Sequence, residues 1–591
     1  MAEKRSGNAF DFSLLKRLFR FVSPYKTLWY TAVTITLLVA AVSPVRPYLV
    51  EQTIDDTILT GNYRELLIMV SWMVALLFAE SVLQFLSTYS SNQLGQFVIR
   101  DIRAQLFRHL NRFKLKYFDN TAVGTLVTRV ISDIETIASI FSEGFLQILA
   151  DFLKIFTVIG VMLYQDWKLT LITLIPVPLL VIATNIFKNG IKKTFGEVRN
   201  KVAELSAFVQ EHVVGMSIVQ IFSREDQEMK KFREINGQHR KAHIRSIWYY
   251  SVFFPVVEVI TAISIGLVVW YAAGEMVAAQ SARGEASPGL IISFVLYIYI
   301  LYRPMRQLAD RFNTLQMGVV SAERVFAILD SNPVIEDTGT EDAGSIAGDI
   351  SFRDVYFAYN DEDYVLNGIS FDAYRGEKIA LVGATGSGKT SVINLLSRFY
   401  EYNSGTIYLD GKKIESYSLN SLHHSVSVVL QDVFLFSDTI LNNITLFNPH
   451  ISEAEVIEAS KQIGTHEFIS RLPGGYHFHV SERGGLLSAG QKQLISFLRA
   501  YVHKPKVLIL DEATSSVDTE SELLIQKATE VITEGRTSII IAHRLSTIRH
   551  ADKILVLDKG HIIETGSHHT LMEKENGAYR KLIELQFAES E

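Results

Sequence analysis

Residues 383–390 combine three glycines, a lysine and a threonine at a spacing that suits phosphate binding. The segment follows the apolar run Lys378–Val382 and precedes a segment with a helical pattern, as the motif G-x-x-x-x-G-K-[ST] requires. Glycines let successive backbone N–H groups point inward at phosphate oxygens, and a helix N-terminus adds partial positive charge. Lys389 can place a charge between the β- and γ-phosphates, and the Thr390 hydroxyl can ligate Mg²⁺. The predicted phosphate-contacting residues are Gly383, Ala384, Thr385, Gly386, Ser387, Gly388, Lys389, Thr390 and Ser391.

Two adjacent acidic residues, Asp511 and Glu512, follow the continuous apolar run Val507–Leu510. Such a run is typical of a buried strand, and a carboxylate at its end is costly unless a cation meets it. Mg²⁺ is the obvious cation, so Asp511 is predicted to be a metal ligand. Glu512 could orient and polarise an attacking water. A salt-bridged surface pair is the alternative, and the apolar strand in front of the pair disfavours it.

A second stretch of small and polar residues, Leu487–Gln491, opens another segment with a helical pattern. Backbone amides in such a loop could also contact an anion. The chain therefore carries two segments suited to phosphate, well separated in the sequence. This raises the question of which phosphate the second segment contacts.

The elements that must position these groups form a soluble C-terminal half. From about Asp349, short β-branched runs alternate with helical segments. The segments 378–383, 506–511 and 537–543 each contain a continuous apolar run, which is the pattern of a parallel sheet covered on both faces. The preceding segment 331–349 is acidic and rich in Gly, Ser and Thr, and is typical of a linker.

The N-terminal half is much more apolar. The 591-residue chain is 48% hydrophobic and 20% charged, which is too apolar for an ordinary cytosolic enzyme and too charged for a pure membrane bundle. Each membrane crossing needs about 20 apolar residues. Six stretches meet this length, near 27–49, 65–90, 144–164, 169–188, 248–274 and 289–309. The absence of cysteine excludes disulfides, and a net charge of −6 gives no indication of a nucleic-acid partner.

Basic residues predict the orientation in the membrane. They are concentrated in the N-terminal segment and in the long connections 91–143 and 189–247, whereas the other connections are short and acidic or mixed. The N-terminus, both long connections and the C-terminal half are therefore predicted to face the cytoplasm. Residues 11–20 predict a helix along the inner membrane surface. The long connections keep a helical period, with turns expected near Asp119–Gly124 and Gly215–Ser223.

These motifs, in this order over nearly the whole chain, resemble the ATP-binding cassette transporters, specifically exporter half-transporters. The resemblance implies an all-α membrane domain of six helices with long cytoplasmic extensions. It also implies that this domain is fused to an α/β P-loop ATPase with an antiparallel β subdomain and a helical subdomain. The predicted divisions are a cytoplasmic N-terminal segment, a transmembrane domain, a linker and a nucleotide-binding domain, at residues 1–26, 27–325, 326–348 and 349–591.

The same resemblance suggests roles for further residues. Tyr359 would stack on adenine, although simple packing is the ordinary reading of a lone tyrosine. Gln431 would approach Mg²⁺ and the attacking water. His543 would hydrogen-bond the γ-phosphate, although a satisfied core histidine is the alternative. Residues 515–518 look like the loop that crosses to a partner cassette.

The resemblance also answers the question of the second loop. Such loops cover the γ-phosphate held by another cassette, so Ser488, Gly490 and Gln491 are predicted to contact the partner's nucleotide. With one membrane half and one cassette, the chain must dimerise with a second half-transporter. Ala489, Leu494 and Ser481 depart from the usual family pattern, and a methyl at 489 disfavours left-handed backbone conformations. These departures favour a heterodimer, and a homodimer stays open.

The resulting prediction is a cell-membrane exporter that uses ATP and Mg²⁺ to move amphipathic drugs, lipids or similar molecules by alternating access. The alternative is an ATP-gated channel or regulator on the same scaffold, against which the intact Glu512 and His543 argue. Several ionisable residues fall in or near the predicted spans: Arg46, Glu80, Asp151, Lys154, Glu258 and Arg303. Asp151 and Lys154 share a helical face, so they could neutralise each other or meet substrate.

Overall fold

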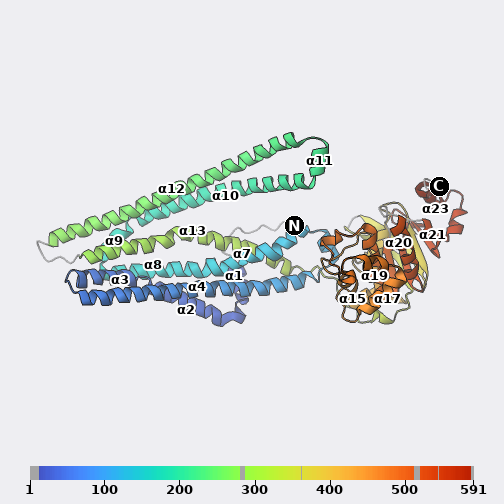
Figure 1. The fold of residues 1–591 in the computed structure, drawn as a ribbon, viewed down its shortest axis with the longest axis horizontal. Helices are drawn as coiled ribbons and strands as arrows, with labels where there is room; N and C mark the ends of the chain where they lie inside the picture. Colours follow the sequence, from blue (N-terminus) through green and yellow to red (C-terminus); the bar gives the residue numbers. More distant parts are fainter. Residues whose placement is uncertain (1–11, 280–286, 361–362, 512–518, 543–544, 588–591) are drawn as a thin grey trace. The chain divides into compact units, whose positions relative to one another are not determined.

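The computed structural model describes residues 12–279, 287–360, 363–511, 519–542 and 545–587, which form two compact units (Figure 1). The first unit comprises Met1–Arg112 and Ala122–Asn332, and the second comprises Phe113–Thr121 and Pro333–Glu591. The short segment 113–121 therefore belongs to the second unit, although helices of the first unit precede and follow it.

The first unit is helical, and the prediction of six membrane helices is confirmed. In the described part of the chain, six helical segments are long and apolar enough to cross a membrane: Ser23–Ile58, Tyr63–Leu110, Val123–Gln165, Trp167–Val214, Glu225–Glu275 and Pro288–Asp330. Its α-helices are α1 (Phe12–Arg20), α2 (Lys26–Val42), α3 (Val45–Gln52), α4 (Tyr63–Leu110), α6 (Val123–Thr128), α7 (Ile134–Ser139), α8 (Leu146–Gln165), α9 (Trp167–Leu174), α10 (Val177–Val214), α11 (Met216–Ile221), α12 (Glu225–Ala279) and α13 (Pro288–Asp330). Short π-helical turns cover Thr53–Ile58, Arg129–Asp133 and Ile140–Phe145.

Side-chain caps fix where several of these helices begin. The Asp166 carboxylate accepts hydrogen bonds from the backbone N–H groups of Lys168 and Leu169, at 2.7 and 3.0 Å, and so ends α8 and starts α9 within one residue. The Ser287 hydroxyl accepts from Leu290 N–H at 3.1 Å, and Pro288 stands at the first helical position of α13. Both arrangements satisfy N–H groups that would otherwise lack partners.

The predicted helical connections are also present. Helices α4, α10 and α12 continue well beyond the apolar stretches, and α10 and α12 lie side by side and are joined by α11 (Figure 1). The expected turn near Gly215–Ser223 is therefore the short helix α11 and its flanking residues. The tip is apolar and exposed, with Val214, Ile218, Ile221 and Phe222 open to solvent.

The second unit is built on a six-stranded sheet with the order β10-β9-β3-β8-β7-β6. Strands β3, β6, β7, β8 and β9 are parallel to their neighbours, and β10 pairs antiparallel with β9. Their bounds are β3 (Lys378–Val382), β6 (Val426–Val429), β7 (Val507–Asp511), β8 (Thr537–Ile541), β9 (Lys553–Asp558) and β10 (His561–Gly566). The three continuously apolar runs of the sequence are therefore the central parallel strands, as predicted.

Alternate residues of these strands enter two separate cores. Ala380 and Val382 face a core that contains α19 and its neighbours, whereas Ile379 and Leu381 face a core shared with the antiparallel sheet. Because successive side chains of a strand point to opposite faces, a sheet covered on both sides needs apolar residues at every position. This explains why these strands show no alternation of apolar and polar residues.

The antiparallel sheet has the order β2-β1-β4-β5. Its strands are β1 (Ile350–Ala358), β2 (Tyr364–Ala373), β4 (Ser404–Leu409) and β5 (Lys412–Lys413). The helices of this unit are α5 (Leu115–Asp119), α14 (Lys389–Leu396), α15 (Leu419–Ser425), α16 (Ile440–Thr445), α17 (Glu453–Ile463), α18 (His466–Arg471), α19 (Ala489–Val502), α20 (Thr519–Thr533), α21 (Leu545–Arg549), α22 (His568–Met572) and α23 (Ala578–Phe587). The predicted fold class is confirmed.

Candidate active site

The phosphate loop lies between β3 and α14, as the sequence predicted. Gly383, Gly386 and Gly388 have φ values of +153°, +82° and +105°, which side chains with a Cβ rarely adopt. At Gly383 a Cβ would also lie 2.2 Å from the carbonyl oxygen of Leu557. Gly388 directly precedes α14, whose first N–H groups have no partner within the helix. The loop therefore presents the geometry of an anion-binding cradle.

Lys389 already lies across this cradle. Its side-chain amine donates hydrogen bonds to the carbonyl oxygens of Gly383 and Ala384, at 2.8 and 2.9 Å. The residue is only 8% exposed, and this burial lowers the pKa of Lys389, an effect that the nearby Asp511 carboxylate partly opposes. An anion in the cradle would supply the countercharge that a buried ammonium needs.

Asp511 and the phosphate loop meet at one edge of the sheet. Strand β8 lies between β3 and β7, and all three are parallel, so their carboxyl ends share that edge. Asp511 is the last residue of β7 and is 9% exposed, whereas Thr390 and Gln431 are exposed. A carboxylate, a hydroxyl and an amide oxygen are suitable donors for Mg²⁺, which often keeps phosphate and water ligands as well. Among the described residues no cluster of three or more His, Cys, Asp or Glu side chains could hold a metal.

Tyr359 lies beside the phosphate loop rather than in an isolated position. Its hydroxyl is 3.1 Å from the Ser391 hydroxyl and accepts a hydrogen bond from the Asn394 amide at 3.0 Å. Its ring makes edge contacts with Phe357 and Tyr400, with centroids 4.7 and 5.0 Å apart. Sequence reasoning identified Tyr359 but missed Asn394 and Tyr400. Their only local signal is that they follow the phosphate loop closely in the sequence: Asn394 lies on α14, and Tyr400 lies four residues after that helix ends.

The second loop forms a well-capped helix start. Ser488 is the N-cap of α19: its hydroxyl accepts from Gln491 N–H at 3.2 Å, and the Gln491 side chain accepts from Ser488 N–H at 3.0 Å. Ala489 is the first residue of this helix, and alanine is the most favourable residue in helices. Ala489 is not among the residues with positive φ, so its methyl carries no left-handed backbone penalty in this structure. Gly490 lies in the first turn, where backbone N–H groups have no intrahelical partner.

Three sequence predictions lie outside the described residues. These are Glu512, His543 and the loop 515–518. Their roles stay predictions, although the strands that lead to them, β7 and β8, end at the same sheet edge as β3.

In the membrane unit, Asp151 forms an ion pair that the sequence analysis did not anticipate. The Asp151 carboxylate lies 2.6 Å from the Arg311 guanidinium on α13, and the two side chains are 11% and 22% exposed. Arg311 was not among the residues singled out in the sequence.

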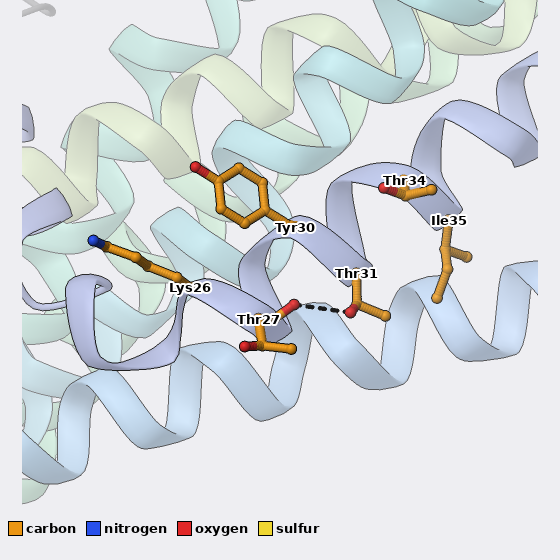
Figure 2. Close-up of a pocket in the computed structure, with 6 residues that line it drawn as sticks. All are labelled: Lys26, Thr27, Tyr30, Thr31, Thr34 and Ile35. Carbon is orange, nitrogen blue, oxygen red and sulfur yellow. Dashed lines mark hydrogen bonds between the residues drawn. The ribbon is translucent and has the colours of Figure 1, made fainter.

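A groove of about 560 Å³ runs along α2 in the same unit (Figure 2). It is lined by residues of this one helix: Lys26, Thr27, Tyr30, Thr31, Thr34 and Ile35. The Thr31 hydroxyl donates to the Thr27 carbonyl oxygen at 2.8 Å, so it is satisfied within the helix. A lysine and a tyrosine at the start of an apolar helix suit the membrane–water interface. The groove is separate from the phosphate loop.

Comparison with known proteins covers both units. Residues 29–305 match the family model of the ABC transporter transmembrane region, and residues 366–515 match that of the ABC transporter. The chain is 38% identical over 585 residues to the uncharacterized ABC transporter ATP-binding protein YknV of Bacillus subtilis, covering 98% of this chain and 95% of the relative. It is 36% identical over 576 residues to the ATP-dependent lipid A-core flippase of Desulfotalea psychrophila, covering 97% and 99%. It is 37% identical over 581 residues, again covering 97% and 99%, to YgaD of Bacillus subtilis, provisionally named as a multidrug export ATP-binding/permease protein.

Proposed function

Because the chain belongs to the ATP-binding cassette transporter family, we propose that it exports amphipathic molecules such as drugs or lipids across the cell membrane by alternating access. Family membership establishes ATP binding, ATP hydrolysis coupled to transport, and a multi-pass membrane location. The names of two relatives, for lipid A-core flipping and multidrug export, support an amphipathic substrate. The observation that carries the proposal is a phosphate loop and six apolar helices in one chain.

The proposed organisation follows the sequence predictions. Residues 1–26 form a cytoplasmic segment with an interfacial helix, 27–325 the transmembrane domain, 326–348 a linker and 349–591 the nucleotide-binding domain. The N-terminus and the ATPase face the cytoplasm, because basic residues are concentrated in the N-terminal segment and in the two long connections, and six crossings place the C-terminal half on that same side. The assignment of residues 113–121 to the ATPase unit supports this orientation for the first long connection.

Residue roles in ATP binding follow from the geometry of the loop. The backbone N–H groups of residues 383–391 bind the phosphates, and Lys389 exchanges its two carbonyl partners for the β- and γ-phosphate oxygens. Tyr359 stacks on adenine. Thr390, Gln431 and Asp511 would hold Mg²⁺, which would neutralise charge that develops on the phosphates. The position of Asp511 at the end of a buried strand fits this role.

In hydrolysis, the carboxylate of Glu512 would orient and polarise the attacking water. Gln431 would also contact that water, and the imidazole of His543 would donate a hydrogen bond to the γ-phosphate. After cleavage the phosphate loop retains ADP, and the bond between the two cassettes weakens because the γ-phosphate no longer joins them.

The working unit we propose is a dimer of half-transporters. Ser488, Gly490 and Gln491 of one chain cover the γ-phosphate bound by the other, with the N-terminus of α19 directed at that anion. The exposed apolar tip around α11 supports a partner, since such a tip is costly to leave in water. The departures at 481, 489 and 494 favoured a heterodimer, but the helical position of Ala489 removes one of these reasons. Purification of the chain alone, with its mass and ATPase activity measured, decides between the two.

The test uses Glu512→Gln in the full chain reconstituted into proteoliposomes. We expect this variant to bind ATP, to lose turnover and to accumulate as a closed dimer. Glu534→Gln is the matched control, because it makes the same change at an exposed site. Uptake of a fluorescent amphipathic dye and a short-chain fluorescent phospholipid into inside-out vesicles measures export. ATPase activity of Glu512→Gln equal to that of the control would contradict the catalytic role, and passive ion conductance without uptake would instead indicate a channel.

A further inference from the structure

Tyr400 connects the predicted adenine site to the segment between two membrane helices. Its ring makes edge contacts with Tyr359 and Phe357, with centroids 5.0 and 5.8 Å apart and planes 85° and 71° apart. Its hydroxyl donates a hydrogen bond to the carboxylate of Asp119, the last residue of α5. One side chain therefore contacts both the nucleobase-side tyrosine and α5.

The contacts of Tyr359 determine how a bound base could affect the neighbouring residues. Its hydroxyl is bonded to Ser391 and Asn394 on α14, the helix that begins at the phosphate loop. Its ring makes T-shaped contacts with Phe357 and Tyr400, with the ring planes 76° and 85° apart. A purine stacked on the Tyr359 face would restrict the tilt of this ring, since aromatic stacking holds ring planes parallel. Because the rings of Tyr400 and Tyr359 are in direct T-shaped contact, the position of Tyr400 depends on that tilt.

On the other side, α5 is held in the ATPase unit at more than one point. Residues 113–121 belong to that unit, and Lys114 N–H donates to the carbonyl oxygen of Pro333 at 2.8 Å. Phe113 is buried and makes an edge contact with Tyr117 at 4.7 Å. Helix α4 precedes this segment and α6 follows it, so the chain joins α5 to a helix of the membrane unit on each side.

The hydrogen bond between Tyr400 and Asp119 is costly to lose. Tyr400 is 8% exposed, and a buried hydroxyl without an acceptor is unfavourable. Burial, and then the hydrogen bond with Asp119, raise the pKa of Tyr400, so its hydroxyl stays protonated and keeps donating. Hydrogen bonds to an ionised acceptor are also about twice as strong as neutral ones. The bond is therefore suited to hold α5 in one position.

We propose that Tyr400 is a positioning residue that couples occupancy of the Tyr359 face by the nucleobase to the position of α5 through Asp119. This inference rests on the proposed stacking role of Tyr359. The coupling must be reciprocal: if base binding strengthens the hold on α5, then release of α5 weakens binding of the base. The effect should depend on the nucleoside, because Tyr400 contacts the ring of Tyr359, on which the base would stack.

The first experiment measures equilibrium binding of ATP and of inorganic tripolyphosphate to the full chain in nanodiscs, without divalent cation so that neither is hydrolysed. Tyr400→Phe removes the hydroxyl and keeps the ring, and Asp119→Ala removes the acceptor. We expect each to weaken ATP binding about five-fold, the lower end of typical coupling between sites. The double variant should be no weaker than either single variant, because both remove the same bond. Tripolyphosphate affinity should not change.

Two further variants separate positioning from a general structural effect. Asp119→Asn keeps a carbonyl oxygen as acceptor and should bind ATP nearly as wild type does. Tyr402→Phe makes the same chemical change two residues away, where the hydroxyl is bonded to Glu415, and should also match wild type. Equal loss of ATP and tripolyphosphate affinity, or additive effects of Tyr400→Phe and Asp119→Ala, would overturn the proposal.

A second experiment observes α5 directly. The chain has no cysteine, so Thr121→Cys provides one labelling site next to α5. ATP should change the fluorescence of an environment-sensitive probe there, and Tyr400→Phe should remove the change. The same response in Tyr400→Phe would refute coupling through this residue. Wild-type protein that binds ATP no more tightly than tripolyphosphate would refute the stacking role of Tyr359, while export measured in vesicles would be unaffected by either result.

Discussion

Replacement of Gly383 by alanine should disrupt the phosphate loop by two separate effects. The residue has a φ of +153°, and an added Cβ would lie 2.2 Å from the Leu557 carbonyl oxygen and 2.8 Å from the Ser387 hydroxyl oxygen. The first of these atoms belongs to the backbone of β9, which pairs with β3. A backbone atom cannot turn away as a side chain can, so either the strand or the loop must move.

The cost can be estimated from these contacts. Overpacking of a well-packed site costs about 1–3 kcal/mol, and a strained backbone conformation costs about 1–3 kcal/mol more. The expected loss of unfolding free energy is therefore about 2–6 kcal/mol. Gly411 provides a matched control, because its φ is +73° and no atom lies within 4 Å of an added Cβ. There only the left-handed backbone penalty of about 1–2 kcal/mol applies.

The assay is thermal unfolding of the full chain in detergent, together with equilibrium ATP binding. For a domain of this size, 1 kcal/mol corresponds to about 2–4 °C. Gly383→Ala should lower the unfolding transition of the ATPase unit by more than Gly411→Ala does, and only Gly383→Ala should weaken ATP binding. The reasoning is refuted if both variants unfold at the same temperature and bind ATP equally well.

Two other predictions concern charged groups. Burial lowers the pKa of Lys389 in the nucleotide-free fold below its ordinary value of 10.5. At pH values between this lowered pKa and 10.5, the unfolded chain therefore binds more protons than the folded chain. The unfolding free energy should therefore rise with pH in that window, and a denaturant series on Lys389→Met should show a flatter dependence; identical pH profiles would contradict this. Asp151→Ala leaves Arg311 without its partner and should cost about 3 kcal/mol, which Arg311→Leu in the same chain should largely restore. Thermal unfolding in detergent measures both changes, and a single variant as stable as wild type would refute the pairing.

Local patterns made much of this structure predictable. The phosphate loop was identified because its chemistry depends on residues within eight positions, and the central strands because burial on both faces leaves a continuous apolar run. The helix beginning at Ala489 shows a limit of the same reasoning. Sequence reasoning considered only that the methyl of Ala489 disfavours left-handed backbone conformations, whereas the structure places Ala489 inside the first turn of a right-handed helix.

Contacts between distant parts of the chain were not predictable. Tyr400 and Asp119 are 281 positions apart, and neither residue type indicates the other. Lys154 lies three residues after Asp151, and residues at this spacing are neighbours on one face of a helix, so the sequence suggested that these two residues pair. The observed partner, Arg311, lies on α13, and only the packing of α8 against α13 could reveal it. In both cases the missing information is which surfaces of separate elements face each other.

The assignment of residues 113–121 to the ATPase unit has a mechanical consequence. The chain passes between the two units at 112/113, at 121/122 and at 332/333. Three peptide connections, rather than a single linker, therefore join the two units. Because α4 ends just before residues 113–121 and α6 begins just after them, a displacement of this segment would act on two helices of the membrane unit and not on one.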